Sequence, residues 1–262
     1  MTLLTIDELS VKIGSSPILN SVTFELQQGK IIGLIGANGS GKSTLLKAIA
    51  DLIPYSGQIC WRGQPIKKLP SRARAKTIGY LGQSRLPSWS LSVRDFVALG
   101  RLPFEDRNKN GGKKILEKSI LECDLADLSD RLVTQLSGGE LARARIARVI
   151  AGEPTLLLLD EPIAGLDPLH QLEIMLLLQE KVSEGLTVFL VLHDLSLAAR
   201  FTNRLILLKE GCILVEGPTA PVLNSTNLAE AFKINSRYCV TDGIPYVVPT
   251  YPIKTLSEPQ KG

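Results

Sequence analysis

Hydrophobic positions follow two different patterns along the chain. Residues 3–30 alternate between apolar and polar positions, with turn signals at residues 14–17 and 27–29, which predicts antiparallel strands. Three later apolar runs, at residues 31–35, 156–159 and 187–192, do not alternate. Apolar runs of this length that are joined by helices indicate a parallel sheet covered on both faces. The pattern therefore predicts an α/β fold, in which an antiparallel β subdomain leads into a mainly parallel sheet flanked by helices.

Between residues 85 and 151 the pattern becomes helical. Apolar residues recur at helical spacing over residues 92–99 and 114–121, and the polar residues 105–112 between them predict a solvated loop. Strands and helices then alternate again, with helices expected at 169–184, 195–201 and 226–232, a strand at 204–208 and a hairpin about Gly211. We therefore expect one core formed by residues 1–84 and 152–225, an inserted α-helical subdomain at residues 85–151, and a C-terminal tail at residues 226–262.

The composition fits one large globular domain, or a core with an insertion. Of the 262 residues, 44% are hydrophobic and 21% are charged, and no apolar run approaches the roughly 18 residues that a membrane-spanning helix needs. The start of the chain lacks the basic stretch and apolar segment of a secretory signal, so we expect it to remain in the cytosol. A net charge of +4 gives no case for nucleic acid as the main partner. Four scattered cysteines without a C-x-x-C spacing indicate reduced thiols rather than a disulfide framework or a zinc site.

A glycine-rich stretch lies between the apolar run at residues 31–35 and residues 45–50, which are apolar at helical spacing. A strand, a glycine-rich turn and a helix are the context that a phosphate-binding loop requires, and every fixed position of G-x-x-x-x-G-K-[ST] is filled. Backbone N–H groups in such a loop point at a polyphosphate. Lys42 would reach the β- and γ-phosphates, and the Ser43 hydroxyl would bind Mg²⁺. The residues of this phosphate loop are Gly36, Ala37, Asn38, Gly39, Ser40, Gly41, Lys42, Ser43 and Thr44. The alternative, a glycine-rich turn that binds nothing, is disfavoured by the complete match.

Two carboxylates and a histidine follow apolar runs that are expected to be buried strands. Asp160 and Glu161 come directly after residues 156–159, and ligands of open α/β sheets bind at the carboxyl ends of strands. Asp160 is placed to hold Mg²⁺, and Glu161 to orient or deprotonate a water that attacks the γ-phosphate. The alternative is that both carboxylates only cap the next turn. His193 ends another apolar run, which alone would indicate a buried core histidine, but its occurrence together with the other two motifs favours a γ-phosphate contact. His170 has no such context and is expected on a helix surface.

The segment Leu136-Ser137-Gly138-Gly139-Glu140 precedes a helical run. Ser137 is a natural N-cap, and Glu140 three residues later completes the spacing of a capping box. Gly138 and Gly139 allow close backbone approach, so this helix start is also suited to bind an anion. A second anion site is surplus in a monomer whose phosphate loop already holds one side of a triphosphate. We therefore predict a symmetric dimer, in which this helix start covers the nucleotide held by the other chain.

These motifs, in this order, resemble the ATP-binding cassette family over residues 3–225. The matching motifs are the Walker A loop (36–44), the Q-loop (Gln83), the signature (136–140), the Walker B strand with the catalytic glutamate (156–161), the D-loop (164–167) and the switch histidine (His193). The resemblance implies a P-loop NTPase, two copies of which enclose two ATP·Mg²⁺ and hydrolyse them. It implies Glu161, His193 and Gln83 as catalytic residues, Asp167 and the signature as nucleotide contacts, and Ser43, Gln83 and Asp160 as Mg²⁺ ligands.

A single cassette without a membrane segment resembles the separate ATPase subunit of a bacterial importer. This implies integral membrane permease subunits and, indirectly, a substrate-binding protein, with the chain at the cytoplasmic face of the inner (plasma) membrane. Residues 91–103, the glutamate that ends the signature, and the tail resemble the iron-siderophore, haem and cobalamin uptake group. The alternatives are a soluble cassette in assembly or scaffolding, of the iron–sulfur type, and a cassette associated with nucleic acid. The sequence does not identify the transported solute, because other chains select it.

Two positions depart from the family pattern. Where many cassettes carry an aromatic residue that stacks on adenine, this chain has Ile13, which predicts weaker adenine discrimination with activity retained. The signature ends in Glu140, where glutamine is commoner, and this favours its helix-capping interpretation without weakening the functional one.

Overall fold

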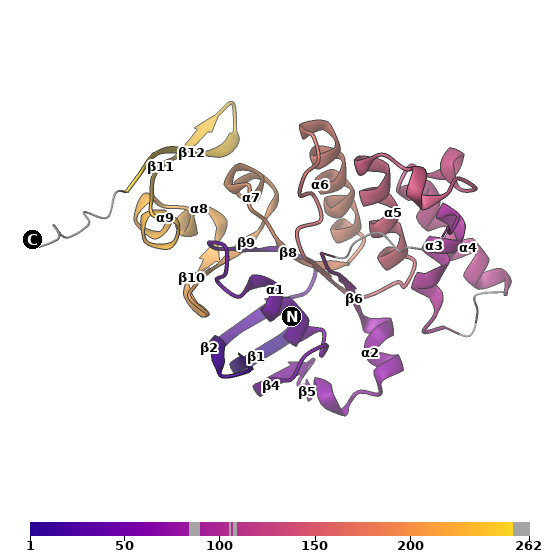
Figure 1. Cartoon of the computed structure of the whole chain (residues 1–262), viewed down its shortest axis with the longest axis horizontal. Coiled ribbons are helices and arrows are strands. Elements are labelled where there is room, and N and C mark those ends of the chain that lie inside the picture. Colours follow the sequence, from indigo (N-terminus) through magenta and orange to yellow (C-terminus); the bar gives the residue numbers. More distant parts are fainter. Residues whose placement is uncertain (84–89, 105, 107–108, 254–262) are drawn as a thin grey trace, which may run out of the picture.

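The computed structural model describes residues 1–83, 90–104, 106 and 109–253 (Figure 1). Several expectations fall outside these residues: the start of the inserted helical part at residue 85, residues 105, 107 and 108 of the polar loop, and residues 254–262 of the tail.

Six strands form the central sheet, in the order β10-β9-β3-β8-β7-β6. Strands β9, β3, β8, β7 and β6 pair parallel, and β10 pairs antiparallel with β9. The strands are β3 (Ile31–Ile35), β6 (Ile78–Leu81), β7 (Leu156–Leu159), β8 (Thr187–Val191), β9 (Arg204–Lys209) and β10 (Cys212–Pro218). The expected α/β class with a mainly parallel sheet is confirmed.

Both faces of this sheet are buried, because its strands are apolar at successive positions. Leu156 and Leu158 of β7 pack with α1 (Lys42–Ile49) and with an antiparallel sheet, whereas Leu157 and Leu159 pack with helices on the opposite face. The antiparallel sheet has the order β2-β1-β4-β5, formed by β1 (Thr2–Ile13), β2 (Ser16–Gln27), β4 (Ser56–Trp61) and β5 (Gln64–Pro65). Helices α6 (Pro168–Ser183) and α7 (Leu195–Phe201) lie on the other side of the central sheet (Figure 1). This confirms the expected antiparallel β part.

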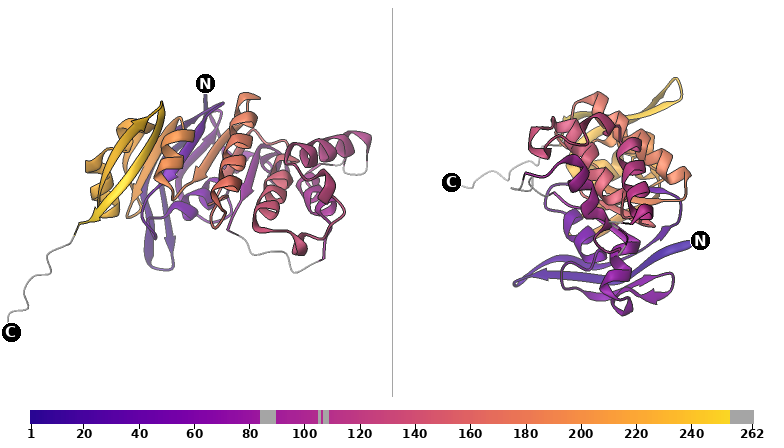
Figure 2. Two further views of the ribbon diagram at one scale, coloured as in Figure 1. Left: turned by 90° about the horizontal axis from the view of Figure 1, so that it is seen from above. Right: turned by 90° about the vertical axis from the view of Figure 1, so that its right-hand side faces the viewer.

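Three helices, α3 (Val93–Ala98), α4 (Asn110–Glu122) and α5 (Gly138–Ile150), lie together beside α6 (Figures 1 and 2). The helix expected at residues 92–99 is confirmed, with Ser92 as its N-cap. The solvated loop expected at residues 105–112 is wrong at its end, because α4 already begins at Asn110. A Cβ at Gly112 would lie 2.2 Å from the Asp106 carbonyl oxygen, so this helix start approaches the preceding backbone too closely for another residue.

The C-terminal part contains more regular structure than the sequence predicts. Helices α8 (Thr219–Val222) and α9 (Ser225–Phe232) are followed by an antiparallel hairpin of β11 (Ile234–Thr241) and β12 (Ile244–Pro252). The hairpin packs on α7, where the Ser196 hydroxyl donates to the Val247 carbonyl at 3.2 Å and accepts from its N–H at 3.1 Å. The sequence predicts neither this hairpin nor the short helix α2 (Ser71–Thr77).

The four cysteines are all free, as expected. Across the described ranges, no helix combines the length and the apolar character that crossing a bilayer needs.

Candidate functional site

Three neighbouring parallel strands carry the predicted site residues at one edge of the central sheet. The phosphate loop follows β3, His193 follows β8 with one residue between, and Asp160 and Glu161 directly follow β7. Because β8 lies between β3 and β7 and all three run parallel, their carboxyl ends meet at this edge. The structure therefore brings together residues that are more than a hundred positions apart in the sequence.

The phosphate loop has a backbone that its glycines make possible. Gly41 has φ +103° at the N-cap of α1, and a Cβ at Gly36, which has φ +154°, would lie 2.3 Å from the Leu208 carbonyl oxygen. The Gly211 N–H donates to the Ser40 carbonyl at 3.1 Å, so the turn after β9 holds the loop in place. The loop is thus a preformed cradle at a helix N-terminus, which favours anions.

Lys42 points back into this cradle. Its Nζ donates to the carbonyl oxygens of Gly36 and Ala37, at 2.8 and 2.9 Å. Burial lowers the pKa of the Lys42 ammonium group, and the charges of Glu161 and Asp160 oppose that shift. The ammonium group therefore sits among loop carbonyls and carboxylates at the point where a polyphosphate would lie.

Ser43 and Asp160 meet in the structure. The Ser43 hydroxyl donates to Oδ1 of Asp160 at 3.0 Å, and Asp160 is only 3% exposed. Burial raises the pKa of Asp160, against the hydrogen bond from Ser43. A hydroxyl and a carboxylate are both hard oxygen ligands of the kind that Mg²⁺ takes. The Ser40 hydroxyl is buried and has no partner among the described residues, which is a further polar group available to a bound phosphate or its metal. These residues fit a polyphosphate with Mg²⁺.

Glu161 and His193 form a pair next to this cradle. Nε2 of His193 lies 2.6 Å from Oε1 of Glu161, and the histidine side chain is 44% exposed. Glu161 has φ +54°, a left-handed conformation that is uncommon for a residue other than glycine and that concentrates at functional sites. The strained turn after β7 therefore directs the Glu161 carboxylate toward the end of β8.

The predicted capping box of the signature is present at the start of α5. The Ser137 hydroxyl accepts from the Glu140 N–H at 3.3 Å, and the Ser137 N–H donates to Oε2 of Glu140 at 2.7 Å. The hydrogen bond that the Ser137 N–H donates to the carboxylate lowers the pKa of Glu140, with a smaller contribution from the Ser137 hydroxyl. Ser137 and Gly138 are exposed, and among the described residues no hydrogen bond or ion pair joins residues 137–140 to the phosphate loop. The structure thus places the signature apart from the phosphate loop of its own chain.

Asp167 and Gln83, the other two predicted site residues, lie at the start of α6 and after β6. Asp167 is the N-cap of α6, where it accepts from the His170 N–H at 3.1 Å. Gln83 is exposed and comes two residues after the end of β6. Arg145 of α5 donates to the carbonyl oxygen of the adjacent Gly82 at 2.5 Å. Sequence reasoning missed this contact between the signature helix and the Q-loop, because a helical arginine carries no signal of its acceptor.

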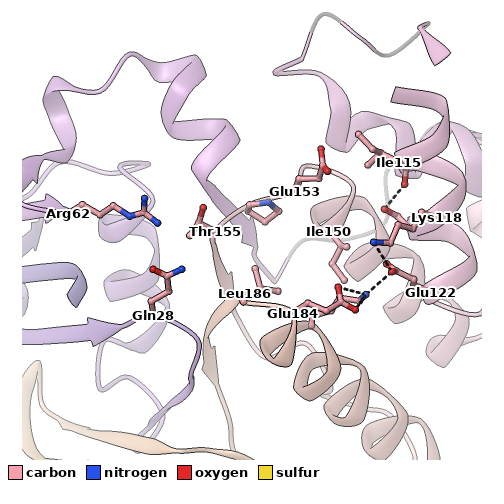
Figure 3. A pocket seen from close by; sticks show the side chains of 14 residues that line it. Gln28, Arg62, Ile115, Lys118, Glu122, Ile150, Glu153, Thr155, Glu184 and Leu186 are labelled. Atoms are coloured by element: carbon pink, nitrogen blue, oxygen red, sulfur yellow. Dashed lines mark hydrogen bonds and ion pairs between the residues drawn. The ribbon is translucent and has the colours of Figure 1, made fainter. Parts of the chain in front are cut away.

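A cavity of about 490 Å³ lies at the opposite edge of the sheet, where Gln28, Thr155 and Leu186 precede β3, β7 and β8 (Figure 3). Here the buried Lys181 of α6 forms an ion pair with Glu122 of α4 at 2.8 Å. This pair joins α4 to the central part of the chain, and none of the predicted site residues lines the cavity.

Comparisons with known proteins show the family to which the chain belongs. The family described as ABC transporter matches residues 19–164. The hemin import ATP-binding protein HmuV of Bordetella avium is 36% identical over 238 residues, which cover 87% of this chain and 91% of that protein. The probable siderophore transport system ATP-binding protein YusV of Bacillus subtilis is 35% identical over 240 residues, which cover 90% and 87%.

Among solved structures, one chain of a transporter assigned to the metal-chelate ABC type, in an inward-facing conformation, is similar with a TM-score of 0.83 and 26% identity. That similarity covers 96% of this chain and 98% of the other. The resemblance seen in the sequence motifs is confirmed, and the chain belongs to the ABC transporter family as one of its ATP-binding proteins, an ATPase.

Proposed function

We propose that this chain is the ATP-hydrolysing subunit of a bacterial importer for a metal chelate of the iron-siderophore, haem or cobalamin kind. The names of its relatives support this choice, because they concern hemin import, siderophore transport and a metal-chelate type transporter. In this proposal the chain works as a homodimer at the cytoplasmic face of the membrane, bound to separate permease subunits and supplied indirectly by a substrate-binding protein. Residues 1–84 and 152–225 form the ATPase core, residues 85–151 the helical subdomain and residues 226–262 the tail.

The observation that carries the ATPase mechanism is the pairing of Glu161 with His193 beside the pairing of Ser43 with Asp160. We assign the phosphate cradle to the loop backbone and to Lys42, and the Mg²⁺ ligands to Ser43, Asp160 and Gln83. Mg²⁺ held by these residues would supply positive charge to neutralise the phosphates. Glu161 orients the attacking water and accepts its proton. His193, whose Nε2 lies 2.6 Å from Oε1 of Glu161, holds this carboxylate in position, and we also assign to His193 a contact with the γ-phosphate.

The proposal needs a second copy because of where the signature lies. Ser137 and Gly138 are exposed at a capped helix start that does not touch the phosphate loop of the same chain. In a symmetric dimer this helix start, with Asp167, would contact the nucleotide that the other chain holds.

The replacement Glu161→Gln tests the hydrolytic part of the proposal. Turnover is expected to fall by about 10²–10⁴-fold with ATP binding retained, because a general base is removed and the cradle is not. Glu180→Gln, an exposed position on α6, is the matched control and should leave turnover unchanged. Unimpaired hydrolysis in the Glu161 variant would refute the assignment.

The transport part is tested by co-purification with the membrane proteins encoded beside the gene, followed by mass spectrometry of the bound solute. We expect a complex whose ATP hydrolysis rises when a metal chelate and its binding protein are added. A chain that hydrolyses ATP with no permease partner, and that co-purifies with iron–sulfur assembly factors, would favour the scaffolding alternative.

A further inference from the structure

One histidine ring joins the start of α6 to the start of α5. His170 lies in the first turn of α6 and Gly139 in the first turn of α5. A Cβ at Gly139 would lie 2.1 Å from Cδ2 of His170, and 2.6 Å from both Cγ and Nε2. Real Cβ atoms essentially never lie so close to other heavy atoms. Gly139 has the helical backbone that any residue adopts, so the ring, and not the backbone, requires a glycine here.

The ring is held on its far side and cannot move away freely. Nδ1 of His170 lies 2.6 Å from Oδ2 of Asp167, and Oδ1 of the same carboxylate accepts from the His170 N–H at 3.1 Å. Asp167 is both the last residue of the D-loop and the N-cap of α6. A swing of the ring away from Gly139 would therefore break its contact with the capping carboxylate. The D-loop, the ring and the signature form one continuous set of contacts.

The two signature glycines differ in what surrounds them. Gly139 is buried under the ring, whereas Gly138 is exposed, and a Cβ at Gly138 would lie no closer than 3.7 Å to its nearest neighbour, Leu166 Cδ2. That distance is an ordinary contact, so packing within the chain requires glycine at position 139 and not at position 138. Ser137 and Gly138 remain on the open side of the helix start.

We propose that His170 is a positioning residue for ATP hydrolysis, and that it fixes the signature against the D-loop of the same chain. Gly139 then leaves room for the ring, and the exposed Ser137 and Gly138 lie on the side that faces the nucleotide of the other chain. A shift of Asp167 would carry the ring and the helix start with it. The inference rests on the proposed function in one respect, that the signature acts on the partner's nucleotide.

A double-mutant cycle tests whether the ring is the reason for the glycine. Gly139→Ala is expected to lower kcat about a hundredfold or more, well below His170→Ala alone, because its methyl group collides with the ring and displaces the helix start. Gly139→Ala combined with His170→Ala should return kcat to within about threefold of His170→Ala alone. Gly138→Ala is the matched control, because adding His170→Ala to it should give no recovery.

Thermal unfolding without nucleotide gives the same cycle a readout that is independent of hydrolysis. The fall in midpoint caused by Gly139→Ala should be smaller when residue 170 is alanine. If Gly139→Ala is equally harmful in both backgrounds, in hydrolysis and in unfolding, the proposal is wrong. If His170→Ala reduces the effect of Gly139→Ala on the unfolding midpoint, but Ser137→Ala hydrolyses ATP normally, the contact between His170 and Gly139 is supported and the proposed role of the signature is rejected. Failure of this inference can thus be distinguished from failure of the proposed function.

The positioning role is separated from simple helix packing by kinetics. His170→Ala should lower kcat about tenfold, while the KM for ATP changes less than about twofold, because the phosphate loop is untouched. Glu173→Gln is the control: it removes the 3.3 Å ion pair with Arg143 that also joins α6 to α5, without contact with Gly139. This control should keep kcat within about twofold of the wild type. Equal losses in both variants would show that His170 only holds two helices together, against the proposal.

Discussion

Burial of Asp160 disfavours the ionised carboxylate that the proposed Mg²⁺ site requires. Its carboxyl group is 3% exposed, and burial raises its pKa in spite of the hydrogen bond from Ser43 and the charges of Lys47 and Lys42. The folded chain therefore holds this proton more tightly than the unfolded chain does. Stability from this group is complete below the unfolded pKa and is lost as the pH rises through the folded pKa. Above the folded pKa the ionised carboxylate therefore lowers the stability of the metal-free protein.

We expect Asp160→Asn to raise the unfolding midpoint of the metal-free protein at pH 7, because a neutral amide replaces a buried carboxyl group whose ionisation the fold disfavours, and the amide oxygen still accepts from Ser43. Each kcal/mol gained corresponds to roughly 2–4 °C for a chain of this size. The difference from the wild type should shrink as the pH is lowered toward 4. Calorimetry in EDTA measures this, and a repeat with Mg²⁺ and ATP should show less ligand stabilisation in the variant than in the wild type. A variant that is less stable in EDTA would contradict the argument.

Ile13 is a second single residue with an expected effect, because its side chain stands where an aromatic residue would stack on the adenine base of ATP. It is 61% exposed at the end of β1, and the paired strand β2 lies over the phosphate loop, where a Cβ at Gly41 would lie 2.7 Å from Leu19 Cδ2. We expect Ile13→Tyr to tighten ATP binding by about tenfold, since stacking on an aromatic is worth about 1–3 kcal/mol. Titration with ATP and GTP measures the effect, with Ile244→Tyr on the distant hairpin as control. Unchanged affinities for both nucleotides would reject it.

At the scale of elements, the capping box at the start of α5 both stabilises the helix and fixes the position of the signature. The Ser137 and Glu140 side chains satisfy the first N–H groups of the helix, which leaves Ser137 and Gly138 exposed and fixed. Hydrogen bonds from Ser137 lower the pKa of Glu140, so its contribution to stability is present above the unfolded pKa and is lost as the pH falls through the folded pKa.

We expect Glu140→Ala to lower the free energy of unfolding by about 0.5–1.5 kcal/mol, because the Ser137 N–H loses the hydrogen bond that it donates to the Glu140 side chain. Glu140→Gln should keep most of that stability and keep hydrolysis within about twofold, since an amide oxygen also accepts from the Ser137 N–H. Denaturant unfolding at pH 7 and pH 4 separates the two, because the advantage of glutamate over glutamine should shrink at the lower pH. A glutamine variant as unstable as the alanine variant would rule out the capping explanation.

Elements with strong local signals could be predicted from the sequence. The helix expected at residues 195–201 coincides with α7, and the capping box at Ser137 is present as its spacing predicts. The residues of the phosphate loop, Asp160, Glu161 and His193 converge because parallel strands place their carboxyl ends at one edge, which the buried apolar runs already indicate.

Other features depend on contacts that no local pattern carries. The three prolines of β12 argue against a strand, yet it pairs on one side only, with β11, so their missing N–H groups are tolerated. Asp242 and Gly243, both with positive φ, form the turn of this hairpin, and Asp-Gly is its local sequence signal. Helix α2 has no buried residue, so it leaves no apolar periodicity to detect. The reason for Gly139 is a ring that lies on a different helix.

At the scale of the whole molecule, the two halves of the proposed nucleotide site face different surroundings. The phosphate loop sits at the carboxyl end of β3, and the signature sits at the start of α5, beside α6 and away from that loop (Figure 1). The Arg145 hydrogen bond to Gly82 and the His170 contact with Gly139 tie α5 to the Q-loop and to α6 of the same chain. These contacts hold the signature with Ser137 and Gly138 exposed, where in the proposed dimer the second molecule would bring its nucleotide.

This arrangement predicts that ATP itself drives association. Glu161→Gln with ATP and Mg²⁺ is expected to run in light scattering at twice the 28.5 kDa of the single chain, because nucleotide is bound and not hydrolysed. Gly138→Leu in that background should stay monomeric and fold normally, since a Cβ at this position meets only an ordinary contact at 3.7 Å within the chain while its side chain would occupy the space of the partner's nucleotide. Leu52→Ala, at an exposed position after α1, is the control and should still associate. Association of the Gly138 variant as strong as that of the control would mean that the signature does not face the other chain's nucleotide.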